Sequence, residues 1–167
     1  MSSIRRCAFF VRLAAALAAA SGTLAHEIPS DLTVQIIVKP AADKVQVLVR
    51  APLDGMQDIE FPTLGPGYLD LPRAGPSLRN AAQVWLSRDI GIYENGRRLP
   101  VLDIAALRVS IPSDRSFATF DGALANLRGP PLADDTQIPW QQALLDVQFE
   151  VPIESELSEF AIDARLD

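Results

Sequence analysis

Apolar and polar residues alternate in several short runs, which is the pattern of strands that bury one face. The first two runs cover residues 32–39 and 45–50, and the turn-forming residues 40–43 between them predict an antiparallel hairpin. A third run over 90–93 leads into Asn95-Gly96, a pair that accepts the positive φ angles of a tight turn. Further strands are expected over 107–111, 145–151 and 160–166.

Two other stretches space their apolar residues three and four positions apart, as a helix does. The first predicts a helix from about residue 77 to 88, with its apolar face at Leu78, Ala81, Ala82, Trp85 and Leu86. The second predicts a helix over 116–127, with Phe117, Phe120, Leu124 and Leu127 on one face and Gly-Pro-Pro after it. Residues 61–76 contain four prolines and three glycines, which favours a long irregular surface loop.

Strands in antiparallel succession, with one or two short helices in the connections, indicate a mainly β fold. We expect an antiparallel, immunoglobulin-like β-sandwich, in which alternate residues of two sheets meet in one core. Residues 26–167 are expected to form this single domain. Because the last alternation is still running at Asp167, the pattern also predicts that the natural polypeptide continues.

The first 25 residues have the three parts of an export signal. Arg5, Arg6 and Arg12 give a positive start, residues 13–20 are an apolar run, and a small-residue cleavage site ends at Ala25. The apolar run is shorter than the roughly 20 residues that a membrane-spanning helix needs. We therefore expect cleavage after Ala25 and a mature domain in the periplasm or another extracytoplasmic space.

The composition of the chain that remains after cleavage limits which partners and reactions are expected. The mature chain keeps 12 basic and 21 acidic residues, a net charge of −9, which disfavours nucleic acid and anionic lipid as partners. Cys7 is the only cysteine and leaves with the signal. The mature domain then has no disulfide, no thiol nucleophile and no cysteine-ligated metal, and we expect no cofactor.

Two sets of residues could still carry chemistry. His26, the only histidine, would become the amino-terminal residue, where its amine and imidazole could chelate nickel or copper in a metal-capture module. Paired carboxylates could serve a hydrolase, and the candidates are Asp134, Asp135, Glu154, Glu156 and Glu159. The alternative reading is a solvated terminus and ordinary surface acids. We assign no catalytic, cofactor-binding or metal-binding residue.

Several segments together resemble a known family. They are His26-Glu27-Ile28-Pro29, Leu32-Thr33-Val34-Gln35, Val49-Arg50-Ala51-Pro52-Leu53, Asp58-Ile59-Glu60-Phe61-Pro62, residues 65–71 and residues 93–99. They are similar to the extracytoplasmic amino-terminal region of bacterial membrane proteins of the HupE/UreJ type. The resemblance implies an outer domain followed by transmembrane helices, in proteins linked to hydrogenase or urease maturation and to nickel or cobalt. The His- and Asp-bearing membrane helices are missing from these 167 residues, so no metal-site residue is carried over.

The sequence therefore favours a non-catalytic exported domain that acts by binding. Its expected partner is a membrane protein of that type, or a transmembrane region of its own if the natural chain continues. In the second case the domain would be membrane-associated.

Overall fold

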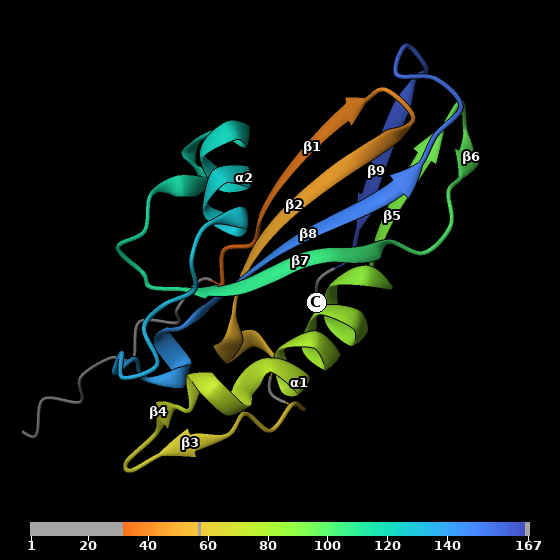
Figure 1. The fold of residues 1–167 in the computed structure, drawn as a ribbon. Coiled ribbons are helices and arrows are strands. Elements are labelled where there is room, and N and C mark those ends of the chain that lie inside the picture. Colours follow the sequence, from red (N-terminus) through yellow and green to blue (C-terminus); the bar gives the residue numbers. More distant parts are fainter. Residues whose placement is uncertain (1–31, 57, 166–167) are drawn as a thin grey trace, which may run out of the picture. The chain divides into compact units, whose positions relative to one another are not determined.

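The computed structural model describes residues 32–165 except residue 57, and its largest sheet has four antiparallel strands in the order β1-β2-β8-β7 (Figure 1). They are β1 (Gln35–Ala41), β2 (Lys44–Pro52), β7 (Asp103–Ser110) and β8 (Leu144–Pro152). Strands β1 and β2 form the predicted hairpin. Its turn consists of Ala42 and Asp43, because Ala41 already pairs with Lys44.

A second sheet has three antiparallel strands in the order β6-β5-β9. They are β5 (Ile90–Glu94), β6 (Arg97–Arg98) and β9 (Phe160–Ala164). The turn predicted between β5 and β6 is confirmed, since φ is 50° at Asn95 and 78° at Gly96. Although β8 and β9 follow each other in sequence, they belong to different sheets.

The prediction of an irregular loop over residues 61–76 is wrong. A small hairpin of β3 (Thr63–Leu64) and β4 (Tyr68–Leu69) turns through Gly65 and Gly67, both at positive φ. Helix α1 (Leu71–Ala81) then starts six residues earlier than expected and continues as a π-helical segment, Ala82–Ser87. Pro72 lies in the first turn, where an N–H would have no acceptor within the helix, so proline is compatible with this start.

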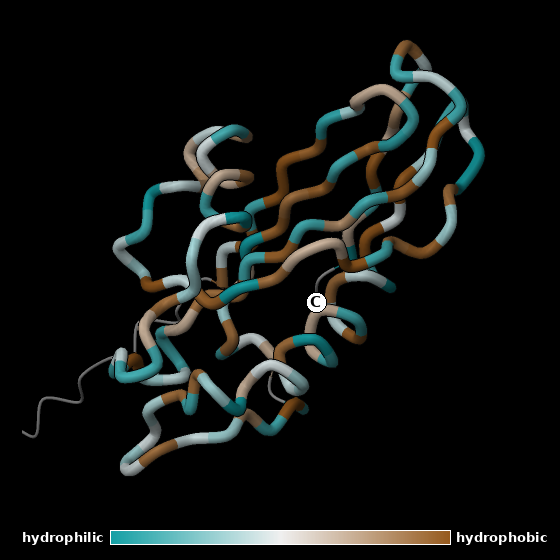
Figure 2. Tube along the Cα trace, viewed as in Figure 1, coloured by the Kyte–Doolittle hydropathy of each residue, from teal (hydrophilic) through white to brown (hydrophobic). Residues whose placement is uncertain are grey.

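The main core lies between the inner face of the four-stranded sheet, α1 and β5. Alternate residues of β2 and β8 point into it, as the sequence predicts, and Figure 2 shows hydrophobic positions recurring along β1 and β2. The β2 and β8 members are Val45, Val47, Val49, Ala51, Leu145, Val147, Phe149 and Val151. Ala74, Leu78 and Ala81 of α1 and Ile90 and Ile92 of β5 join the same cluster. The structure confirms a mainly β, antiparallel fold with short helices in its connections.

The outer face of the four-stranded sheet is covered at one end by α2 (Phe120–Arg128). The helix predicted over 116–127 is divided into a 3-10 turn, Ser116–Ala118, and α2, because Thr119 is extended and caps α2. Its side-chain hydroxyl accepts a hydrogen bond from the Gly122 N–H at 3.1 Å. Leu48 of the sheet is buried together with Phe117, Ala123 and Leu127. Outward-facing residues of β2 and β8 near this helix are therefore covered.

Candidate functional site

A charged cluster is buried under α2, on the outer face of the four-stranded sheet. Arg50 of β2 and Asp146 of β8 are cross-strand partners and are only 4% and 0% exposed. The guanidinium donates from Nε to Asp146 Oδ1 at 2.6 Å and from Nη2 to Asp146 Oδ2 at 2.7 Å. This bidentate geometry is the strongest arrangement of an arginine and a carboxylate.

The same two side chains anchor the segment that covers them. Arg50 Nη2 also donates to Asp114 Oδ1 at 2.8 Å, and Nη1 donates to the Asp114 carbonyl oxygen at 3.0 Å. Asp146 Oδ2 accepts further hydrogen bonds from Ser110 Oγ at 2.6 Å and from Asn126 Nδ2 of α2 at 3.0 Å. The cluster thus joins β2, β7, β8, the loop before α2 and α2 itself.

The titration behaviour of the cluster follows from these contacts. Burial by itself would lower the pKa of Arg50, but hydrogen bonds and charge from Asp146 and Asp114 outweigh it and raise this pKa. Burial would raise the pKa of Asp114, yet hydrogen bonds from Ser116 and Arg50 lower it overall. The charged forms of Arg50 and Asp114 are therefore favoured, and the polar groups that stabilise them come from the domain itself.

A second buried acid, Glu94, binds backbone groups at the other end of the domain. It lies in β5 with 1% of its surface exposed, and its carboxylate accepts N–H groups from Glu154 at 2.9 and 3.0 Å and from Ser155 at 3.1 Å. Burial would raise the pKa of Glu94, but these backbone hydrogen bonds and the charge of Arg97 lower it. Glu94 therefore holds the loop between β8 and β9 against β5.

The acids considered for a hydrolase are not brought together. Asp134 and Asp135 are exposed in the loop that leads toward β8, whereas the three glutamates lie in the loop beyond its other end (Figure 1). A nine-residue strand is about 27 Å long, far more than the roughly 10 Å or less that separates the carboxylates of a glycosidase.

The glutamates of that loop instead make local contacts. Glu154 pairs with Arg97 at 2.7 Å, and Glu156 accepts the Ala42 N–H at 3.0 Å. Glu159 donates its backbone N–H to the Asn95 side-chain oxygen at 3.1 Å. These contacts fix the loop to the turns of the two hairpins.

The signal over residues 1–25 and the metal hypothesis for His26 lie outside the described residues. Over residues 32–165 without residue 57, no three His, Cys, Asp or Glu side chains are grouped so that they could hold a metal ion. In the same part of the chain no helix combines the length and apolar character needed to cross a membrane.

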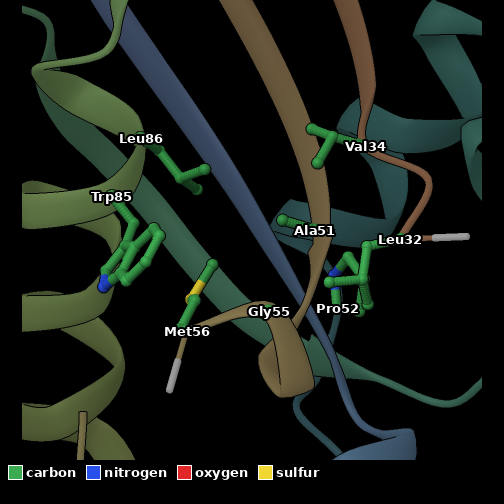
Figure 3. A pocket seen from close by; sticks show the side chains of 8 residues that line it. All are labelled: Leu32, Val34, Ala51, Pro52, Gly55, Met56, Trp85 and Leu86. Carbon is green, nitrogen blue, oxygen red and sulfur yellow. The ribbon is translucent and has the colours of Figure 1, made fainter. Parts of the chain in front are cut away.

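An apolar pocket opens between the four-stranded sheet and the end of α1 (Figure 3). Trp85 and Leu86 face it from the π-helical segment, opposite Val34 and Ala51 (Figure 3). Leu32, Pro52, Gly55 and Met56 complete its wall, the last two at the end of a 3-10 turn, Leu53–Gly55. Its cavity volume is about 90 Å³, well below the roughly 300–1,000 Å³ of typical small-molecule pockets. The pocket can therefore accept a small apolar side chain but not a drug-sized ligand.

Alternation alone places Arg50 and Asp146 on polar strand faces and gives no sign that they are buried. Glu94 follows the strand expected over 90–93, at the start of the predicted turn, and nothing there indicates burial either. One signal was available: Arg50 and Asp146 have opposite charges on strands that both alternate strongly, so they could form a cross-strand pair. That signal requires knowing that β2 pairs with β8, which lies almost a hundred residues away. Trp85 lies on the apolar helix face as predicted and is partly buried against the core.

Known proteins add no family assignment to this geometry. No protein-family model matches the chain, and neither the curated proteins nor the solved structures contain a match. The fold is a mainly β antiparallel domain with an apolar pocket beside α1 and two sites, at Arg50–Asp146 and at Glu94, where buried charges are hydrogen-bonded within the domain.

Proposed function

We propose that this chain is a non-catalytic exported domain that acts by binding a membrane protein of the HupE/UreJ type, or as the outer part of such a protein. The apolar pocket beside α1 is the proposed contact site. It would receive an apolar side chain from an extracytoplasmic loop of that membrane protein.

The observation that carries the proposal is how the polar and apolar groups are distributed. Three buried charged side chains, Arg50, Asp146 and Glu94, are hydrogen-bonded to other groups of the domain. The pocket, in contrast, is lined entirely by apolar residues and is open at Leu32, which is 47% exposed. Covering such a rim removes apolar surface from water, which is the dominant favourable term in protein association.

The segments behind the family resemblance give a second, independent support. Ala51 and Pro52, which belong to the segment 49–53, line the pocket. Residues 65–71 lead directly into α1, whose continuation carries Trp85 and Leu86 on the opposite wall. The residues that resemble the outer domains of these membrane proteins thus lie next to the proposed contact site.

Photo-crosslinking in the native cells tests this proposal. A benzophenone amino acid is placed at position 32 on the pocket rim, and in a matched variant at position 157, which is 91% exposed in the loop after β8. We expect position 32 to give an adduct with an integral membrane protein that mass spectrometry identifies as HupE/UreJ-type, and position 157 to give none. Equal adducts at both positions, or none at position 32, would contradict the pocket as contact site.

Export is tested separately by fractionating the same cells and sequencing the amino terminus of the recovered chain. The expected product begins at His26 and is released with the periplasmic fraction or is held at the outer side of the membrane. A full-length chain in the cytosol would refute the proposal as a whole.

A further inference from the structure

Strand β9 is an edge of its sheet, because the order β6-β5-β9 gives it a partner on one side only among the described residues. Two backbone contacts fix which residues face that partner. The Asn95 N–H donates to the Glu159 carbonyl at 2.8 Å, and the Arg165 N–H donates to the Asp89 carbonyl at 3.0 Å. Since backbone groups alternate sides along a strand, the odd residues face β5. Phe160, Ile162 and Ala164 then direct their N–H and C=O groups outward.

In the described part of the chain, the other three edges of the four-stranded and three-stranded sheets carry features that discourage pairing with another molecule. Strand β1 has Lys39 and Pro40, β7 has a register shift between Ile104 and Ala106, and β6 is only two residues long. Strand β9 reads Phe-Ala-Ile-Asp-Ala, is regular over its five residues, and contains neither proline nor lysine. Of these four edges, β9 is therefore the one best suited to accept another strand.

The apolar face of the three-stranded sheet is buried at β5 but partly exposed at β9. Ile92 of β5 is 2% exposed, while Ile162, its direct partner in β9, is 47% exposed. Directly paired residues of an antiparallel sheet project from the same face. A strand placed outside β9 would bring a neighbouring side chain beside Ile162 on that face.

The charges that flank β9 indicate what that strand is. In an antiparallel pair of two β9 strands centred on Ile162, Glu159 of each copy lies opposite Arg165 of the other, and Phe160 lies opposite Ala164. Centring the pair on Ala161 would place Glu159 opposite Asp163, and centring it on Asp163 would place two aspartates opposite each other. Like charges directly opposite are destabilising, so charge favours the register centred on Ile162 over these two. It is also the register that pairs all five residues of β9.

We propose that β9 pairs with β9 of a second copy of this chain, around a two-fold axis at Ile162, so that the two three-stranded sheets become one of six strands. The outward groups of Phe160, Ile162 and Ala164 form six hydrogen bonds across the axis, and the two Ile162 side chains lie side by side. Within one copy Arg165 Nε lies 3.3 Å from Asp163 on the surface, and the guanidinium turns from there to Glu159 of the other copy. A contact of this length is small, so the dimer is weak and depends on concentration.

Sedimentation equilibrium over a concentration series, at low and at high salt, tests the proposal on the purified chain. The wild type is expected to dimerise reversibly, and less strongly in high salt because the flanking pairs are exposed. Glu159→Arg and Arg165→Glu each create two repulsive pairs and are expected to weaken the dimer about tenfold. The double variant Glu159→Arg/Arg165→Glu restores both attractive pairs and is expected to dimerise like the wild type.

Mixing the two single variants gives a sharper result. A copy with Glu159→Arg and a copy with Arg165→Glu have two attractive pairs only when they pair with each other, so the mixture is expected to form heterodimers while each variant alone stays largely monomeric. Leu157→Lys, in an exposed position before β9, is the control and should leave dimerisation unchanged. Circular dichroism checks that every variant is folded, which is expected because these side chains are on the surface.

Three outcomes would overturn the proposal. The first is a wild type that stays monomeric at every concentration, and the second is a dimer that none of the charge variants affects. The third is a monomer in which the amides of Phe160, Ile162 and Ala164 already exchange slowly with solvent, which would mean that another segment occupies the edge.

Discussion

Replacing Asp146 by Asn is expected to destabilise the domain strongly without changing its shape. The substitution keeps the size of the side chain but removes the charge opposite Arg50, whose guanidinium is almost completely buried. Breaking a buried ion pair from one side costs about 3–5 kcal/mol of unfolding free energy. Asp114 still contacts Arg50 Nη2 at 2.8 Å, so we expect a loss near the lower end, about 3 kcal/mol.

That loss can be measured by urea unfolding followed through tryptophan fluorescence, since the chain has two tryptophans. The midpoint should fall while the denaturant slope stays unchanged, because the folded structure is the same. In thermal unfolding the same loss corresponds to a decrease in Tm of about 10 °C. A domain of this kind typically has about 5–15 kcal/mol in total, so the variant stays folded but marginal.

Glu150→Gln is the matched control. Glu150 lies on the same face of β8 and accepts from Lys44 of β2 at 2.7 Å, but both side chains are partly exposed. Such a pair is worth about 0–1 kcal/mol, so the control should lose little. Arg50→Met combined with Asp146→Asn should lose less than the sum of the two single changes, because no buried charge is left unpaired. Equal losses for Asp146→Asn and Glu150→Gln would refute the argument that burial makes the difference.

Three further predictions concern the ends of the domain. The pKa of Glu94 is lowered in the folded state. The stability that ionised Glu94 contributes is therefore present above its ordinary pKa of 4.5 and is lost as the pH falls below that value. The urea midpoint of Glu94→Gln should depend less on pH between about 5 and 3 than the midpoint of the wild type. Thr119→Ala removes the hydroxyl that caps α2 and should cost about 1 kcal/mol in the same assay, a loss that Thr119→Ser should largely avoid. Gly122→Ala would place its Cβ 2.7 Å from the Ser116 carbonyl oxygen, which is backbone and yields little, so about 1–3 kcal/mol should be lost, and an unchanged midpoint would show that the turn before α2 can shift.

The local periods of the sequence determined most of the elements. Alternation over 45–50 and 145–151 predicts strands because it shows which residues face the core and which face away. This pattern depends only on positions next to each other in the chain. Asn95-Gly96 predicted its turn for the same reason, since the φ angles of two residues suffice. Proline counting failed over 61–76 because α1 contains two of these prolines. Pro72 lies in the first turn, where it lacks only an N–H that has no acceptor, and Pro76 lies inside the helix.

Only the tertiary structure decided what depends on residues far apart in the chain. Arg50 and Asp146 look like solvated polar positions until β2 is placed beside β8 and α2 is packed over both. The candidate acids Asp134 and Glu154 look like possible partners until the length of β8 separates them. The pocket lies where β2 faces the helical segment that continues α1. The free edge exists because β9 pairs with β5 in the second sheet and not with β8. Alternation shows which face of a strand a side chain lies on. Strand order and helix placement decide what that face packs against.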